Sequence, residues 1–344
     1  MEQFRKIFKK VGGWDVLRQY ARAHVLFYAL FMTLMCGFTK KSLEIVRIAV
    51  NNKIYKKLYR SNKRFIADYL KAAEKAEKTE KTEKTDKIKD NKDVAADGDH
   101  PKIIWTAWLQ GIENAPEIVK VCHESVKKNI KGYEIIVITE DNYSDYVTLP
   151  DFIIDKYKRG IIGRAHFADL IRVELMFARG GTWLDATVFV TKLHKRDAFY
   201  LDSDLFLFQR LKPGLDGHCR FISNWMITAR KNHPIIALTR ALMHNYWKNH
   251  DFAVDYFFMH YFFRMAAESY PEYWHRVVPV SNSMPHVILL RMFDEYDERI
   301  WKGVTNMVPF HKLSYKFSKE DAAKTGTYYR KIVDGLDLDS GGVS

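Results

Sequence analysis

The segment from 165 to 191, AHFADLIRVELMFARGGTWLDATVFVT, constrains the fold more than any other part of the sequence. Its first half repeats apolar side chains at helical spacing, and the glycine pair that follows predicts the end of a helix. Residues 182–190 are rich in β-branched and aromatic side chains, as in a buried strand. A helix that leads through two glycines directly into a buried strand is typical of an α/β domain.

Two earlier segments support the same fold class. IIWTAW at 103–108 and YEIIVIT at 133–139 are apolar runs of the kind found in parallel sheets covered on both faces. A helical pattern at 118–129 lies between them, which predicts a βαβ unit. Neither GxGxxG nor GxxxxGK[ST] follows the first strand, so the sequence does not favour dinucleotide or P-loop phosphate binding.

Asp185 is a carboxylate within the otherwise apolar run 182–190. Such a charge must be paired, bind a cation or face solvent at the end of a strand. Asp185 and Thr187 are two residues apart, which predicts that both side chains point to one side of the strand. Asp169 and Arg172 are three apart and therefore share a face of the preceding helix. An Asp–Arg ion pair that merely joins helix to strand would explain the same residues.

The N-terminal region carries most of the positive charge. Residues 1–70 hold 15 Lys and Arg against 4 acidic residues, whereas the rest of the chain is almost neutral. Because the basic residues lie outside the predicted α/β domain, we expect no nucleic-acid partner. The apolar run 25–38, VLFYALFMTLMCGF, is shorter than the roughly 20 residues that a spanning helix needs. It predicts either a helix at a membrane surface or a helical hairpin packed on the main domain.

These patterns divide the chain into four parts: a basic helical arm at 1–70, a charged linker at 71–100, a globular domain at 101–330 and a tail at 331–344. The linker is a Glu/Lys/Thr run with almost no apolar residue, so we expect a solvated helix or a flexible tether. The three cysteines are scattered and form no CxxC, which favours a reducing, cytoplasmic location.

Five sequence blocks, in order over residues 100–317, resemble the capsular polysaccharide synthesis protein family. They are PKIIWTAWLQG with APEIV, HFADLIR, GGTWLDATVFVT, DYFFMHYFF at 255–263 and HKLSYK at 311–316. The family consists of sugar transferases related to the DXD-containing transferases. The resemblance implies a GT-A-like, Rossmann-like mixed sheet flanked by helices, to which the helical N-terminal arm is added. The first 100 residues are not needed for it.

The resemblance also implies a nucleotide-sugar donor, whose diphosphate leaving group requires a cation. The Asp-x-Asp motif of the wider superfamily stands here as Asp185-Ala186-Thr187, without the second carboxylate. We expect Mn²⁺ or Mg²⁺ as the cofactor, with Asp185, Thr187 and His311 as its ligands.

The same resemblance assigns roles around the donor. Asp169 and Arg172 would contact the sugar and the ribose or phosphate, since an Arg suits phosphate and a carboxylate suits hydroxyls. Trp105 would stack on the base, unless it packs in the core. Lys312 and Lys316 would close over the diphosphate, unless they belong to a solvated basic strand.

Three further residues concern the acceptor. Asn224 would face the gap between donor and acceptor, while Asp255 and His260 would bind the acceptor or serve as a base. A buried histidine beside a carboxylate is also an ordinary core arrangement.

We therefore expect a glycosyltransferase that moves a sugar to a growing, lipid-linked capsular or exopolysaccharide acceptor with retention of configuration. The basic arm would hold it at the inner face of the cell membrane. The alternative is a catalytically inactive GT-A-like scaffold of a polysaccharide assembly complex, which the missing second Asp favours.

Overall fold

The computed structural model describes residues 13–87, 101–211 and 219–335. A five-stranded sheet in the order β2-β1-β3-β6-β5 forms the centre of the main domain. Its strands are β1 (Ile103–Ala107), β2 (Glu134–Ile138), β3 (Gly181–Leu184), β5 (Leu205–Phe206) and β6 (Met226–Ala229). β1 runs parallel to β2 and β3, whereas β6 is antiparallel to β3 and β5. This mixed sheet, with helices on both faces, confirms the expected GT-A-like α/β class.

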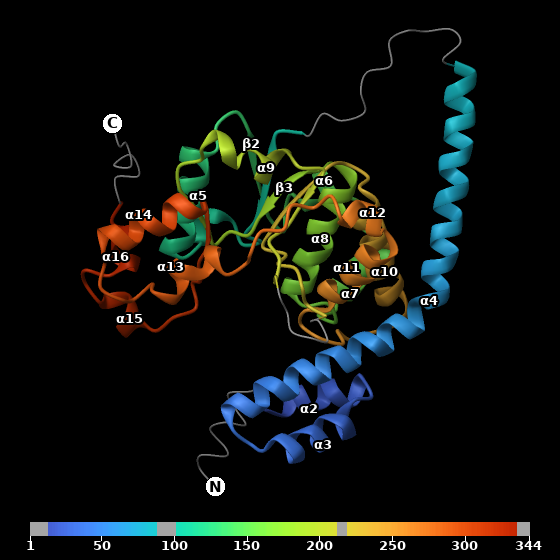
Figure 1. Cartoon of the computed structure of the whole chain (residues 1–344), viewed down its shortest axis with the longest axis horizontal. Helices are drawn as coiled ribbons and strands as arrows, with labels where there is room; N and C mark the ends of the chain where they lie inside the picture. Colours follow the sequence, from blue (N-terminus) through green and yellow to red (C-terminus); the bar gives the residue numbers. More distant parts are fainter. Residues whose placement is uncertain (1–12, 88–100, 212–218, 336–344) are drawn as a thin grey trace.

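Alternating side chains divide the core between the two faces of the sheet. Trp105, Trp183 and Ile227 pack on one face, and Ile104, Leu184 and Met226 pack on the other. The first face is covered by α7 (Asp151–Lys158), α8 (Arg164–Ala178), α10 (Pro234–Asn249) and α11 (Phe258–Ser269). The second is covered by α5 (Glu117–Asn129) and by a small sheet of β4 (Val188–Val190) and β7 (Phe310–Lys312). Figure 1 shows α5 on one side of the strands and α8, α10 and α11 on the other.

Short helices complete the domain. They are α6 (Tyr143–Tyr146), α9 (Phe199–Asp202), α12 (Pro271–Trp274), α13 (Val287–Leu290), α14 (Glu298–Met307), α15 (Lys319–Ala323) and α16 (Tyr328–Val333), with the 3-10 turns η1 (Ile112–Asn114), η2 (Lys195–Asp197) and η3 (Met284–His286). α13, α14 and α16 pack with α5 into a separate apolar cluster. Helix α16 extends past the boundary expected at 330, and the part of the tail from 336 on lies outside the described residues.

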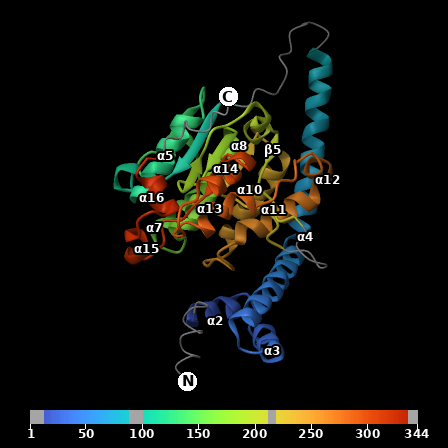
Figure 2. The ribbon, with the colours of Figure 1, turned by 60° about the vertical axis from the view of Figure 1, so that its left-hand side comes forward.

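The N-terminal arm consists of α2 (Gly13–Arg22), α3 (Leu26–Cys36) and the long α4 (Lys40–Lys87). α3 packs back on α4, and α4 contacts α10 and α11. Figures 1 and 2 show α4 passing along the domain, with α2 and α3 gathered at one end of it. α4 continues unbroken across the expected boundary at 70, so residues 71–87 form a helix; residues 88–100 lie outside the described part.

The expectation of one continuous strand at 182–190 is wrong. The segment forms two strands, β3 and β4, separated by a turn in which the Val188 amide donates to the Asp185 carbonyl at 2.9 Å. Asp185 and Thr187 therefore do not share one side of a single strand. The turn sends β4 away from the main sheet to pair with β7, 120 residues later in the chain.

The glycine pair that ends α8 is required by the backbone. Gly180 and Gly181 have φ of +73° and +93°, in the region that favours glycine. A Cβ on Gly181 would lie 2.7 Å from the Ile103 carbonyl oxygen and 3.1 Å from Trp105 Nε1. The close approach of β3 to β1 thus leaves no room for a side chain at 181.

We expect Gly181→Ala to lower the free energy of unfolding by about 3 kcal/mol, because it combines a strained φ with a backbone clash. Gly303→Ala is the matched control, since it lies within α14 and its added Cβ meets nothing within 4 Å. The control should be neutral or slightly stabilising, by up to about 1 kcal/mol. Urea unfolding followed by circular dichroism measures both, and equal stabilities for the two variants would contradict the prediction.

Candidate active site

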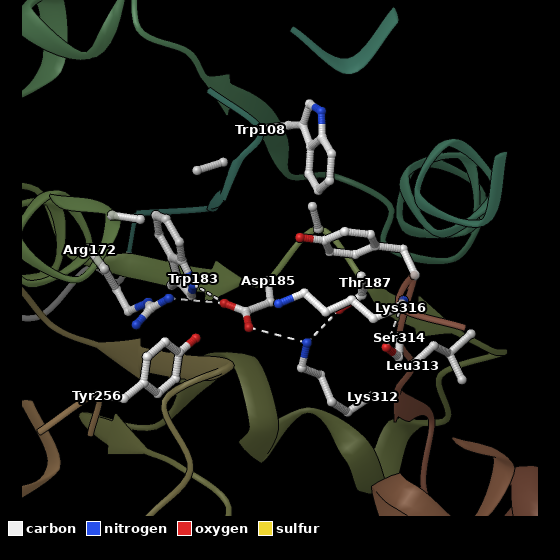
Figure 3. Close-up of a pocket in the computed structure, with 14 residues that line it drawn as sticks. Trp108, Arg172, Trp183, Asp185, Thr187, Tyr256, Lys312, Leu313, Ser314 and Lys316 are labelled. Atoms are coloured by element: carbon white, nitrogen blue, oxygen red, sulfur yellow. Dashed lines mark hydrogen bonds and ion pairs between the residues drawn. The ribbon is translucent and has the colours of Figure 1, made fainter. Parts of the chain in front are cut away.

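A pocket opens at the carboxyl ends of the parallel strands β1 and β3, the place where α/β sheets usually bind ligands. Its cavity measures about 330 Å³. The lining residues are Ala107, Trp108, Ala168, Arg172, Trp183, Asp185, Ala186, Thr187, Tyr256, Lys312, Leu313, Ser314, Tyr315 and Lys316. Figure 3 shows Asp185 between Arg172 and Lys312, with Trp108 across the pocket. A wider depression of about 520 Å³ near η2 shares none of these residues.

Asp185 follows the last residue of β3, and both oxygens of its carboxylate have partners. Oδ1 accepts hydrogen bonds from Trp183 Nε1 and from an Arg172 Nη, both at 3.0 Å. Oδ2 lies 3.3 Å from Lys312 Nζ. The side chain is still 26% exposed, so the ion pairs do not seal it from the cavity.

The surrounding charges keep Asp185 ionised. Burial raises the pKa of its carboxyl, but the charges of Lys312 and Arg172 outweigh that effect and hold the pKa below its usual value. Asp185 is therefore a poor proton acceptor and a strong electrostatic anchor for the two cations.

Arg172 lies behind Asp185 and links it to α8. Its guanidinium donates to Asp169 as well as to Asp185, and it lies 4.6 Å from the ring centre of Trp183. Asn224 Nδ2 donates to Asp169 at 3.1 Å. Arg172 reaches the cavity, whereas Asp169 and Asn224 are not among its lining residues; they position the guanidinium from behind. The predicted shared face of Asp169 and Arg172 is confirmed.

The segment after β7 forms another wall of the pocket. Lys312 donates a hydrogen bond to Thr187 Oγ1, and Leu313, Ser314, Tyr315 and Lys316 follow it along the cavity. The structure thus brings Lys312 and Lys316 to the site, as the sequence predicts.

His311 does not reach the pocket. It is fully buried on the opposite side of β7, where Nε2 lies 3.4 Å from Thr191 Oγ1 and the ring packs near Phe189. Neighbouring residues of a strand face opposite sides, so Lys312 and His311 cannot both face the cavity. Burial lowers the pKa of His311 to about 3. The expectation that His311 is a metal ligand at this site is wrong.

Trp105 is also a core residue. It is buried, its Nε1 donates to the Gly180 carbonyl at 2.8 Å, and its ring packs edge-on against Tyr146. Trp108, just past the end of β1, lines the cavity instead. Among the described residues, its Nε1 is buried without a hydrogen-bond partner. Trp108 follows the last residue of β1, and this position at the end of the strand could have indicated from the sequence that Trp108, and not Trp105, lines the site.

The predicted acceptor residues lie beside the pocket rather than in it. Asp255 accepts from the Phe257 amide at 2.8 Å and from the Tyr261 hydroxyl at 3.0 Å, so it fixes the turn that precedes α11. His260 is buried, and burial, with the charges of Arg220 and Arg172, lowers its pKa to about 3. Neither side chain lines the cavity, but Tyr256 does.

The expected metal ligands do not form a cation site in this arrangement. His311 faces the core, and the Thr187 hydroxyl and one Asp185 oxygen contact Lys312. Within 13–87, 101–211 and 219–335, no three His, Cys, Asp or Glu residues are grouped so that they could hold a metal ion. As arranged here, both oxygens of Asp185 already have N–H partners, and the Thr187 hydroxyl is in contact with the Lys312 ammonium.

The mixed sheet, with a pocket beyond the ends of its parallel strands, gives the chain a GT-A-like α/β fold. The chain belongs to the capsular polysaccharide synthesis protein family, whose model matches residues 44–332. The match begins inside the arm, so it extends further toward the N-terminus than the sequence blocks at 100–317. The family match supports a glycosyltransferase role in capsule synthesis.

One solved structure shows a low similarity to this chain. That structure, "PaToxG Glycosyltransferase", is 14% identical and has a TM-score of 0.36, over 69% of this chain and 88% of that one. The comparison with curated proteins gives no match.

Proposed function

We propose that the chain transfers a sugar from a nucleotide-sugar donor to a growing capsular polysaccharide. The observation that carries this proposal is the composition of the pocket, which places Arg172, Lys312 and Lys316 around a single lining carboxylate, Asp185. Such an excess of positive charge suits a diphosphate. Trp108 offers an aromatic ring at the same cavity, which suits a base or a sugar.

The pocket favours transfer with retention of configuration. Inversion requires a general base for the acceptor hydroxyl, usually an Asp or Glu. Of the residues that line the cavity, Asp185 is the one carboxylate, and its pKa is held below the usual value. In a retaining reaction the departing phosphate itself can take the proton, so the lining residues suffice.

Donor binding and turnover test this proposal. We expect one nucleotide sugar of a panel that varies base and sugar to raise the melting temperature of the full chain and to be hydrolysed slowly without acceptor. Binding without hydrolysis or transfer would favour the inactive scaffold. If no nucleotide sugar binds, the proposal fails.

We further propose that the acceptor is lipid-linked and that the arm holds the protein against the cytoplasmic face of the cell membrane. One face of α3 exposes Phe27, Leu30, Phe31, Leu34 and Met35, which follow the i, i+3, i+4, i+7, i+8 pattern. Exposed basic residues, Arg18, Arg22 and Lys41, flank this helix. An apolar face with basic neighbours suits an anionic lipid surface. Across the described ranges, no helix is long and apolar enough to cross a bilayer.

Two substitutions on α3 test the membrane proposal. Phe27 and Leu34 are 88% and 82% exposed, so Phe27→Ser with Leu34→Ser should leave the fold intact. We expect the double variant to bind vesicles containing phosphatidylglycerol at least about tenfold more weakly in a sedimentation assay, because two large apolar side chains no longer enter the interface. Leu290→Ser, at a residue 79% exposed on the main domain, is the control and should bind like the wild type. Equal binding of all three proteins would exclude α3 as the contact.

A further inference from the structure

Lys312 occupies the place where a GT-A-like transferase would be expected to hold its divalent cation. Two of the expected metal ligands, Asp185 and Thr187, both contact its ammonium. We propose that Lys312 is itself the cation that neutralises the diphosphate leaving group, so that transfer needs no divalent metal. This inference rests on the proposed glycosyltransferase function. It assigns the neutralisation of the departing diphosphate in that reaction to Lys312.

The fold fixes Lys312 at this position. β7 pairs with β4 so that Lys312 lies opposite Val188, and the Leu313 amide donates to the Thr187 carbonyl at 2.9 Å. The neighbouring Phe310 is fully buried and anchors the strand. The ammonium is therefore held against the 185–187 turn by backbone pairing and not only by its own flexible stem.

The coordination of the ammonium leaves it able to bind a ligand. An ammonium has three N–H groups. Thr187 Oγ1 accepts one, and Asp185 Oδ2 lies 3.3 Å away as the partner of a second. The third can point toward a phosphate oxygen, since Lys312 lines the cavity and its side chain is 21% exposed.

The charges of the pocket oppose a divalent ion at Asp185. One oxygen of this carboxylate accepts from Arg172 and Trp183, and the other is paired with Lys312. A metal ion on Asp185 would have to displace one of these cations and would remain close to the other, which is unfavourable at such distances. A diphosphate, in contrast, gains from both cations and from Lys316.

The reaction balances with the groups present. The bond between the anomeric carbon and the diphosphate oxygen breaks, and its electron pair leaves with the diphosphate. The acceptor oxygen forms the new bond to the anomeric carbon, and its proton passes to an oxygen of the departing phosphate. Lys312 transfers no proton in this step and donates a hydrogen bond to the charge that develops.

Inorganic pyrophosphate is a probe that depends on neither the base nor the sugar. We expect the full chain to bind it in EDTA at least as tightly as with Mg²⁺ in isothermal titration calorimetry. Lys312→Met should weaken binding at least tenfold, and Lys312→Arg should stay within about fivefold of the wild type because it keeps the charge. Lys324→Met is the control, since Lys324 pairs with Asp321 away from the pocket, and should not change the affinity.

Binding that requires Mg²⁺ or Mn²⁺, or a folded Lys312→Met variant with unchanged affinity, would overturn the inference, as would no binding to the wild type in either condition. Melting temperatures of the Lys312 variants check the fold. If Lys312→Met unfolds, Lys312→Gln takes its place, because it removes the charge but keeps a hydrogen-bond donor for Thr187. The proposed function fails separately: pyrophosphate binding through Lys312, without turnover of any nucleotide sugar, would leave an anion site but no transferase.

Discussion

Asp185→Asn is expected to lower kcat/KM for the accepted nucleotide sugar by about 10²–10³-fold, the loss usual for a group that organises transition-state charge. The substitution removes the charge that holds Lys312 and Arg172 at the pocket. Asn keeps the shape of the side chain and can still accept a hydrogen bond from Trp183, so the fold should survive. Initial rates of donor hydrolysis, measured over a range of donor concentrations, give kcat and KM separately.

Asp155→Asn is the matched control for this variant. Asp155 also forms an ion pair with an arginine, Arg159, but on the exposed surface of α7 and away from the cavity. The control should retain wild-type kinetics and stability. If Asp185→Asn keeps activity within threefold of the wild type while its melting temperature is unchanged, Asp185 does not organise the site.

Local sequence patterns predicted most of the secondary structure that positions the pocket. The helical spacing before the glycine pair corresponds to α8, and the apolar runs at 103–108 and 133–139 correspond to β1 and β2. These elements depend on side chains close together in sequence, so the spacing of apolar residues within one segment is enough to predict them.

The errors concern contacts between distant parts of the chain. Nothing in the run TWLDATVFV shows that it turns at 185–187, because the cause is the pairing of β4 with β7. The same pairing decides that Lys312 faces the pocket and His311 the core. Because Lys312 and His311 are adjacent on a strand, the sequence shows that their side chains point to opposite sides. It does not show which of the two faces the cavity.

The aromatic segment 255–263 was misinterpreted for a different reason. Asp255 and His260 are ionisable groups among aromatic residues, which suggested chemistry. In the structure, Asp255 fixes the turn that precedes α11, and His260 is buried with a pKa of about 3. This role depends on where the helix begins, and helix ends are the least certain part of a sequence-based assignment. Tyr256, between Asp255 and α11, is the residue that reaches the pocket.

Arg172→Met is expected to lower the free energy of unfolding at neutral pH by about 3–5 kcal/mol, the cost of removing one partner from a buried ion pair. Arg172 contacts two carboxylates, Asp169 and Asp185, and the side chain of Asp169 is almost fully buried. Without the guanidinium, Asp169 keeps its amide contact from Asn224 but loses its counter-charge. Urea unfolding at pH 7.5 measures the loss, and Arg159→Met, from the exposed pair on α7, should cost less than about 1 kcal/mol.

The pH dependence of the free energy of unfolding shows why Arg172→Met is less stable: either the carboxylates lose their counter-charge, or the domain loses packing contacts. Burial already raises the pKa of Asp169 in the wild type, and the removal of Arg172 takes away the charge that opposes this rise. The folded variant therefore binds a proton at Asp169 at a higher pH than the unfolded chain does. Its stability should increase as the pH falls from 7.5 toward 5.

Adding Asp169→Asn to Arg172→Met should recover part of the loss at pH 7.5 and flatten this dependence. A deficit that stays constant from pH 5 to 7.5, with no recovery in the double variant, would mean that the guanidinium stabilises the domain through its contact with Trp183 and not through the two carboxylates.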